Sequence, residues 1–129
     1  MVRRVVLVVG PPGAGKSTLA AQLASSEGLV HLESEMFPQG GFVDAVRQLG
    51  TDPAARAVVV RCCATLDEQR RWEQMAGATE TVVLDVDPDV CARRIVDRGR
   101  PRWRGELLAA KKWRRARAAG KVVTARDPW

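Results

Sequence analysis

One stretch of nine residues constrains this chain more than any other feature, and it reads Gly10-Pro11-Pro12-Gly13-Ala14-Gly15-Lys16-Ser17-Thr18. It matches the pattern G-x-x-x-x-G-K-[S/T], the P-loop, whose glycines let the backbone wrap closely around phosphate groups. The amides from Gly13 to Thr18 are expected to form an anion site at the positive end of the next helix. The expected nucleotide contacts are therefore Gly10, Gly13, Ala14, Gly15, Lys16, Ser17 and Thr18.

Two of these side chains have distinct expected roles. Lys16 is predicted to reach the β- and γ-phosphates, and the hydroxyl of Ser17 to bind Mg²⁺. The flanking sequence fits this motif, because residues 3–9 form a Val- and Leu-rich run typical of a buried parallel strand. Residues 17–26 predict a helix that ends near Gly28. Strand, glycine loop and helix follow one another in the order that a P-loop requires.

The remainder of the chain alternates between predicted strands and helices. Further strands are expected at residues 29–32, 57–63, 81–86 and 121–124, and further helices at residues 42–49, 66–76, 88–97 and 103–119. This alternation predicts one α/β domain over residues 1–129, with a five-stranded parallel sheet flanked by helices. Ligands of such sheets bind beyond the carboxyl ends of the strands, so the residues just after each strand are the candidates for function.

Composition narrows the setting of the protein. The formal net charge is +6, but residues 1–92 carry −4 and residues 93–129 carry +10. A basic C-terminal third suits phosphate-rich ligands, either nucleotides or nucleic acid. Three cysteines without a C-x-x-C pair predict free thiols and a reducing, cytoplasmic location. No run approaches 18 apolar residues, so we expect no membrane span.

Two blocks of the sequence resemble the small P-loop kinases, the group of nucleoside and nucleotide kinases, shikimate- and gluconate-type kinases, zeta-toxin-like phosphotransferases and polynucleotide kinases. The first block is VVLVVGPPGAGKSTLA, and the second is TVVLDVDPDVCARRIVDRGRP. The resemblance implies a sheet ordered 2-3-1-4-5, a nucleotide substrate (ATP or GTP) and Mg²⁺. It also implies an arginine-bearing lid over residues 89–103.

In the resembling kinases, an acidic residue after the second strand takes the proton from the acceptor hydroxyl. Glu33 and Glu35 both follow that strand here, and the spacing from Lys16 favours Glu35. Arg94 and Arg98 lie four residues apart, which places them on one helix face. The resemblance implies that they cover the transferring phosphate, with Arg93 as the alternative residue.

Three other residues leave alternatives open. Arg61 ends the third predicted strand, where many P-loop enzymes have an Asp that supports Mg²⁺, and it could bind an acceptor anion or form a structural ion pair. Asp85 could help to bind Mg²⁺ instead of that Asp. His31, the sole histidine, is interpreted as a packed or edge residue.

The basic C-terminal region also admits two interpretations. Arg126 or Trp129 could stack on the base of the nucleotide. Basic residues along the last predicted helix, interleaved with Trp103 and Trp113, could bind a nucleic-acid strand, or they could be solvated while both tryptophans pack on the sheet. The basic residues concerned are Arg102, Arg104, Lys111, Lys112, Arg114, Arg115 and Arg117.

The function expected from these features is Mg²⁺-dependent transfer of a γ-phosphate to a hydroxyl or phosphate acceptor, above all a small molecule of the nucleoside or nucleotide type. One alternative is a polynucleotide 5′-hydroxyl kinase or a nucleic-acid-associated NTPase, which the basic C-terminal third favours. Another is a non-catalytic nucleotide-binding module, which the Arg at position 61 favours. The sequence does not identify the acceptor, and it leaves the oligomeric state open.

Overall fold

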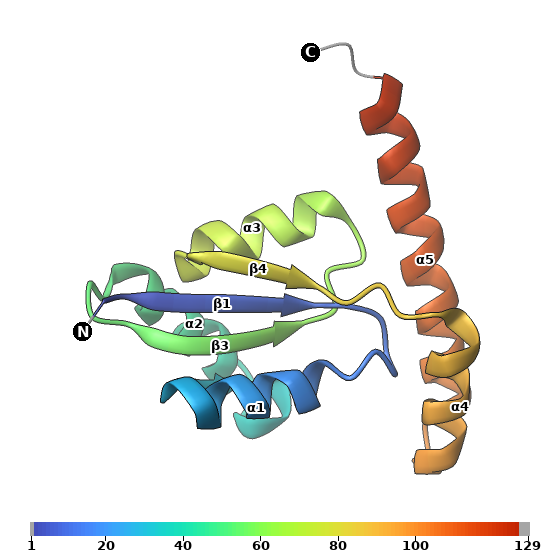
Figure 1. Ribbon diagram of the computed structural model, residues 1–129, viewed down its shortest axis with the longest axis horizontal. Helices are drawn as coiled ribbons and strands as arrows, with labels where there is room; N and C mark the ends of the chain where they lie inside the picture. The colour runs from blue at the N-terminus through green and yellow to red at the C-terminus, as the bar shows by residue number, and fades with distance from the viewer. Residues whose placement is uncertain (1, 127–129) are drawn as a thin grey trace.

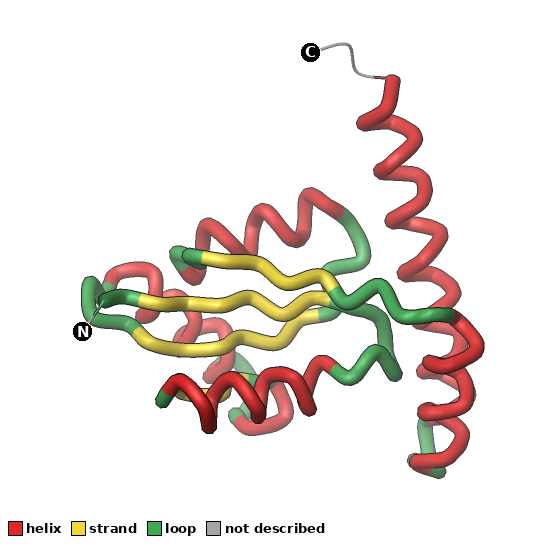
Figure 2. The backbone as a smooth tube through the Cα atoms, viewed as in Figure 1, coloured by secondary structure: helices red, strands yellow, loops and turns green. Residues whose placement is uncertain are grey.

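The computed structural model describes residues 2–126, and their side chains up to residue 118. Strands alternate with helices along most of the chain (Figures 1 and 2). The strands are β1 (Arg4–Val9), β2 (Val30–Leu32), β3 (Arg56–Arg61) and β4 (Glu80–Val83). The helices are α1 (Lys16–Glu27), α2 (Gly41–Thr51), α3 (Leu66–Ala76), α4 (Pro88–Arg98) and α5 (Trp103–Arg126), with a 3₁₀ turn at Ser34–Met36.

The sheet is parallel and has the order β2-β3-β1-β4. The first four places of the expected strand order are therefore confirmed, but the prediction of a fifth strand is wrong. Residues 121–124 belong to α5, which continues through Gly120 to Arg126. A single glycine costs a helix only about 1 kcal/mol relative to alanine, so Gly120 does not end an established 24-residue helix. The described part of the chain thus forms four strands.

Strand β1 is the centre of the hydrophobic core, since Val5 to Val9 are fully buried. Their side chains alternate between the two faces of the sheet. Val6 and Val8 pack with Ala20 of α1 on one face. The other face carries Val5, Leu7 and Val9, which pack with residues of α2 and α3. A run of apolar residues is stable in this position because both faces of the strand are covered.

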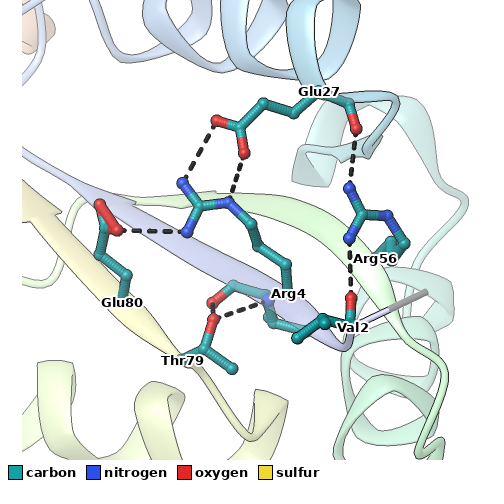
Figure 3. Close-up of polar contacts among 7 residues, drawn as sticks. Val2, Arg4, Glu27, Arg56, Thr79 and Glu80 are labelled. Atoms are coloured by element: carbon teal, nitrogen blue, oxygen red, sulfur yellow. Dashed lines mark hydrogen bonds and ion pairs between the residues drawn. The ribbon is translucent and has the colours of Figure 1, made fainter.

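Arginines fix the opposite end of the sheet from the glycine loop. Arg4 pairs with Glu27 at 2.5 Å and with Glu80 at 3.2 Å, which ties β1 to the end of α1 and to β4 (Figure 3). Arg56 of β3 donates to the carbonyls of Val2 and Glu27 at 2.7 and 2.9 Å (Figure 3). These contacts hold the amino ends of the strands in register, away from the candidate site.

Arg3 has a related role next to this cluster. Its guanidinium donates to the carbonyls of Leu49 at 2.9 Å, Ala76 at 3.0 Å and Gly77. These carbonyls lie at the C-terminal ends of α2 and α3, where a positive charge is favourable because of the helix dipole. One side chain therefore joins both helices that cover this face of the sheet.

Helix α5 crosses the carboxyl ends of the strands (Figure 1). The indole of Trp113 is 4% exposed, and its Nε1 donates to the carbonyl of Cys62 at 2.5 Å. Arg117 donates to the carbonyl of Cys63, and Arg114 to that of Val86, both at 2.7 Å. The helix thus satisfies backbone acceptors that follow β3 and β4.

No described helix, α5 included, combines the length and apolar character that crossing a membrane requires.

Replacing Trp113 tests this docking of α5. Trp113→Phe removes the hydrogen bond to Cys62 and leaves a carbonyl unpaired, so we expect the free energy of unfolding to fall by about 1–3 kcal/mol. Trp103→Phe is the matched control, since Trp103 is partly exposed and lies beneath Arg104; its effect should stay within about 0.5 kcal/mol. Urea denaturation of both variants measures the difference, and equal losses would contradict the described docking.

Candidate active site

The glycine loop joins β1 to α1 and has the backbone shape that its sequence predicts. Gly13 and Gly15 have φ values of 81° and 87°, which favour glycine over any residue with a side chain. A Cβ at Gly13 would lie 2.6 Å from the carbonyl oxygen of Cys91 in α4. Gly13 is therefore required both for the turn and for the close approach of α4 to the loop.

The loop presents donors to one side. Helix α1 begins at Lys16, so the amides of its first turn have no partner within the helix. Lys16 folds back over the loop, and its Nζ donates to the carbonyl of Pro11 at 2.9 Å. Positive charge and free amides at a helix N-terminus form a site suited to phosphate. The loop thus fits the nucleotide phosphates expected from the sequence.

A carboxylate lies next to the hydroxyl that is expected to bind Mg²⁺. Ser17 Oγ donates to Oε1 of Glu33 at 2.5 Å. The other carboxylate oxygen lies 2.9 Å from Nε2 of His31, within ion-pair distance, although this nitrogen makes no aligned hydrogen bond. The side chains of Glu33 and His31 are only 13% and 18% exposed. Glu33 is thus held in a fixed position between α1 and β2.

The structure separates the two glutamates that the sequence leaves as alternatives. Glu33 directly follows β2 and contacts Ser17, whereas Glu35 lies in the following 3₁₀ turn and is exposed. Both line the same cleft as Lys16. His31, interpreted as a packed residue, contributes to this arrangement through Glu33. Sequence spacing did not reveal the contact because it depends on where β2 ends.

The arginines of α4 face the loop from the other side. Arg94 Nη1 donates to the carbonyl of Gly13 at 3.3 Å. Arg98, one turn further along, is exposed and lines the cleft, while Arg93 does not line it. Arg100 beyond the helix pairs with Glu106 at 3.4 Å. Helix α4 thus brings Arg94 and Arg98 to the mouth of the P-loop.

The cleft is open and has a volume of about 1300 Å³. It extends from the glycine loop across the ends of β2 and β3 to α4. Charged side chains from several parts of the chain meet in it, and the main ones are Lys16, Glu33, Glu35, Arg61, Arg94 and Arg98. Among the residues that the structure describes, no three His, Cys, Asp or Glu side chains gather as a metal site. Magnesium often retains several waters and needs few protein ligands. Its expected ligands here are therefore the hydroxyl of Ser17, the substrate phosphates and water.

Neither Arg61 nor Asp85 takes the place of an Asp that supports Mg²⁺ at the end of the third strand. The guanidinium of Arg61 lies 4.4 Å from the ring centroid of Trp72 and 5.5 Å from that of Phe42. Asp85 is 63% exposed, lies 3.8 Å from Arg114, and is not among the residues that line the cleft. The position after β3 is thus cationic, and Asp85 is paired with α5.

The three cysteines differ in exposure, and the exposed one, Cys62, lines the cleft. Cys63 is buried near α5, and burial raises the pKa of its thiol to about 11. At neutral pH this thiol is protonated and unreactive. Burial also lowers the pKa of Arg117, which donates to the Cys63 carbonyl. Cys91 is buried against the loop as packing, and Cys62 is exposed.

The basic C-terminal region is partly used within the fold. Trp113 is buried, so its ring is not accessible for stacking on a base. Arg114 and Arg117 donate to backbone carbonyls of the sheet ends. The side chain of Arg126 and all of Trp129 lie outside the described residues. The contacts therefore favour the interpretation in which α5 packs on the sheet and its remaining charges are solvated.

Comparison with known proteins gives a consistent result. A family model described as an AAA domain matches residues 5–66. A bifunctional pantoate ligase/cytidylate kinase from Synechococcus elongatus is 34% identical over 91 residues, which cover 70% of this chain and only 17% of that protein.

Solved structures of small kinases share the fold. A sugar kinase from Janibacter sp. superimposes with a TM-score of 0.63 at 18% identity, covering 82% of this chain and 73% of that one. A gluconokinase from Sinorhizobium meliloti gives 0.56 at 23% identity, covering 84% and 74%. Shikimate kinase from Acinetobacter baumannii, solved with shikimate, gives 0.53 at 18% identity, covering 95% and 90%. With its P-loop and sheet order, the chain has the fold of the small P-loop kinases.

Proposed function

We propose that this protein is an ATP- and Mg²⁺-dependent phosphotransferase that phosphorylates a hydroxyl group of a small molecule. The observation that carries the proposal is the contact between Ser17 and Glu33 at 2.5 Å. It places a carboxylate at the edge of the P-loop, where an acceptor hydroxyl would approach the γ-phosphate. The similarity to nucleotide, sugar and shikimate kinases supports the same class of reaction.

The side chains nearest the glycine loop have distinct roles in this proposal. The loop amides and Lys16 bind the β- and γ-phosphates, and Ser17 provides a metal ligand. Bound Mg²⁺ would offset the charge of the phosphate oxygens. Glu33, rather than the more exposed Glu35, accepts the proton of the acceptor hydroxyl, because Ser17 and His31 hold its carboxylate in place.

The proposed reaction is a single displacement. The acceptor oxygen forms a bond to the γ-phosphorus, the bond between that phosphorus and the β,γ-bridging oxygen breaks, and the proton passes to Glu33. ADP leaves with the bridging oxygen. Arg94 and Arg98 bind the outer oxygens of the phosphoryl group, where negative charge is spread during the transfer.

The direct test is transfer of labelled γ-phosphate to a panel of nucleosides, nucleoside monophosphates, sugar acids, neutral polyols and 5′-hydroxyl oligonucleotides. Lys16→Ala should reduce transfer by about 100-fold or more, because a cation at the transferring phosphate is lost. Circular dichroism should show an unchanged fold. Unchanged transfer in Lys16→Ala would contradict the assignment, and nucleotide binding without transfer to any acceptor would favour a binding module.

The two glutamates can be distinguished by a matched pair of variants. Glu33→Gln should lower kcat by about 100-fold or more, the scale of a general base, with little change in the Kd for ATP. Glu35→Gln should leave kcat within about threefold of the wild type, since that carboxylate is exposed. Steady-state kinetics with the best acceptor of the panel measures both. A large loss confined to Glu35→Gln would move the role to Glu35.

The arginines of α4 should act on the transition state more than on nucleotide binding. We expect Arg98→Ala to lower kcat far more than it raises the Kd for ATP, and Arg98→Lys to recover only part, because an ammonium lacks the planar fork of a guanidinium. Arg93→Ala is the control on the same helix, since Arg93 does not line the cleft. Full activity in the Arg94/Arg98 double alanine variant would show that both are surface charges only.

A further inference from the structure

Arg61 lines the cleft, but the proposed reaction gives it no role. It is the last residue of β3 and lies beside Val9, the residue that precedes the glycine loop. Neighbouring strands are about 4.8 Å apart, so Arg61 is adjacent to the P-loop in the sheet. Strand β2, which leads to Glu33, pairs with the other edge of β3. Arg61 thus lies at the same end of the sheet as the phosphate site and the proposed base.

Aromatic rings, not carboxylates, hold this arginine. Its guanidinium lies over Trp72 of α3 at 4.4 Å and near Phe42 of α2 at 5.5 Å, and these rings pack on each other with centroids 5.6 Å apart. A guanidinium over an aromatic face keeps its N–H groups at its edge available for a further partner. The stack therefore orients the group without neutralising it.

The other partly buried arginines of the fold contrast with Arg61. Arg4 pairs with two glutamates, and Arg56, Arg114 and Arg117 donate to carbonyls. Throughout residues 2–118, Arg61 has no carboxylate within ion-pair distance, and none of its nitrogens has a hydrogen-bond acceptor. The buried Nε of Arg56 and of Arg117 also lacks an acceptor, but a terminal nitrogen of each donates to a carbonyl. A buried donor without an acceptor is costly for a folded chain. Such a cost is reasonable where a ligand supplies the missing acceptor.

The position in the cleft indicates which ligand this is. Arg94 and Arg98 approach the phosphate site from α4, next to Gly13 and on the β4 side of the loop. Arg61 ends β3, which lies between β1 and the strand that leads to Glu33. A group bound by Arg61 would therefore belong to the molecule whose hydroxyl meets Glu33. Guanidinium groups bind carboxylates and phosphates through two parallel hydrogen bonds, which matches an acidic acceptor.

We propose that Arg61 binds an anionic group, a carboxylate or a phosphate, on the acceptor and so selects acidic over neutral acceptors. This inference rests on the proposed function, because only that function makes the bound molecule a phosphoryl acceptor. The stack on Trp72 and Phe42 fixes the distance between the anion and the hydroxyl that is phosphorylated. Acceptors without the anionic group would leave the donors of Arg61 without a partner and bind more weakly.

Calorimetry with matched ligands tests this binding without requiring turnover. With the P-loop occupied by a non-hydrolysable ATP analogue and Mg²⁺, D-gluconate is compared with D-glucitol as the carboxylate arm. A nucleoside monophosphate is compared with its nucleoside as the phosphate arm. The wild type should bind the anion of at least one pair about 10- to 100-fold more tightly than the neutral partner. The arm that responds identifies the anionic group.

Variants of Arg61 then assign the preference to this residue. Arg61→Met retains an apolar chain against Trp72 and Phe42 but removes the charge, so the preference for the anion should be lost. Arg61→Lys should retain part of it. Arg70→Ala, an exposed arginine of α3 outside the cleft, is the control and should leave the preference unchanged. Thermal unfolding and the Kd for the ATP analogue confirm that each variant is folded and binds nucleotide.

The outcomes separate this inference from the proposed function. Three results would overturn the inference about Arg61. They are equal binding of the charged and neutral partners, no binding of either anion at about 10 mM, and a preference for the anion that persists in Arg61→Met. Arg61-dependent anion binding without phosphate transfer would support it and contradict the phosphotransferase. Transfer to neutral acceptors that is unaffected by Arg61→Met would contradict the selection of acidic acceptors and leave the phosphotransferase standing.

Discussion

The contact between Gly13 and the backbone of Cys91 is the constraint on which the site depends. A single extra carbon at Gly13 would lie 2.6 Å from the Cys91 carbonyl, too close for either segment to stay in place. Because the loop and α4 approach so closely, Arg94 reaches the Gly13 carbonyl and Arg98 lines the cleft. One glycine therefore determines both the shape of the phosphate site and the placement of the arginines that face it.

The rest of the fold holds this contact in place. Strand β1 ends at the loop and is buried on both faces, so the loop starts from a rigid element. At the other end of the sheet, Arg4 and Arg56 tie β1 and β3 to the end of α1 (Figure 3). Helix α5 covers the carbonyls that follow β3 and β4. The candidate site is thus the cleft between the loop, β2, β3 and α4.

Much of this could be predicted from the sequence because the signals are local. The P-loop specifies its own turn, and Thr65 with Gly77 bounds α3 at the residues expected, since caps are encoded within a few positions. The strand expected at residues 121–124 was wrong because Val122 and Val123 favour a strand only where a neighbouring strand can pair with them. Gly120 alone does not end the preceding helix.

The details of the site depended on contacts between distant residues. The choice between Glu33 and Glu35 rests on β2 ending at Leu32, which places the first glutamate against Ser17 and the second on a turn. The sequence did not decide whether Arg61 forms an ion pair or contacts an acceptor, because its stacking partners come from α2 and α3. No spacing rule connects Phe42, Arg61 and Trp72 before the chain is folded.

The four-stranded sheet also has a consequence for self-association. In the described chain β4 is an edge strand, as is β2, so each has backbone donors and acceptors that face no neighbouring strand. Such edges can pair with a second molecule and start aggregation. Here they are only four and three residues long, and the charged Glu80 begins β4. Short edges offer few hydrogen bonds to an incoming strand, so the four-stranded sheet of the described residues presents little edge to a second molecule.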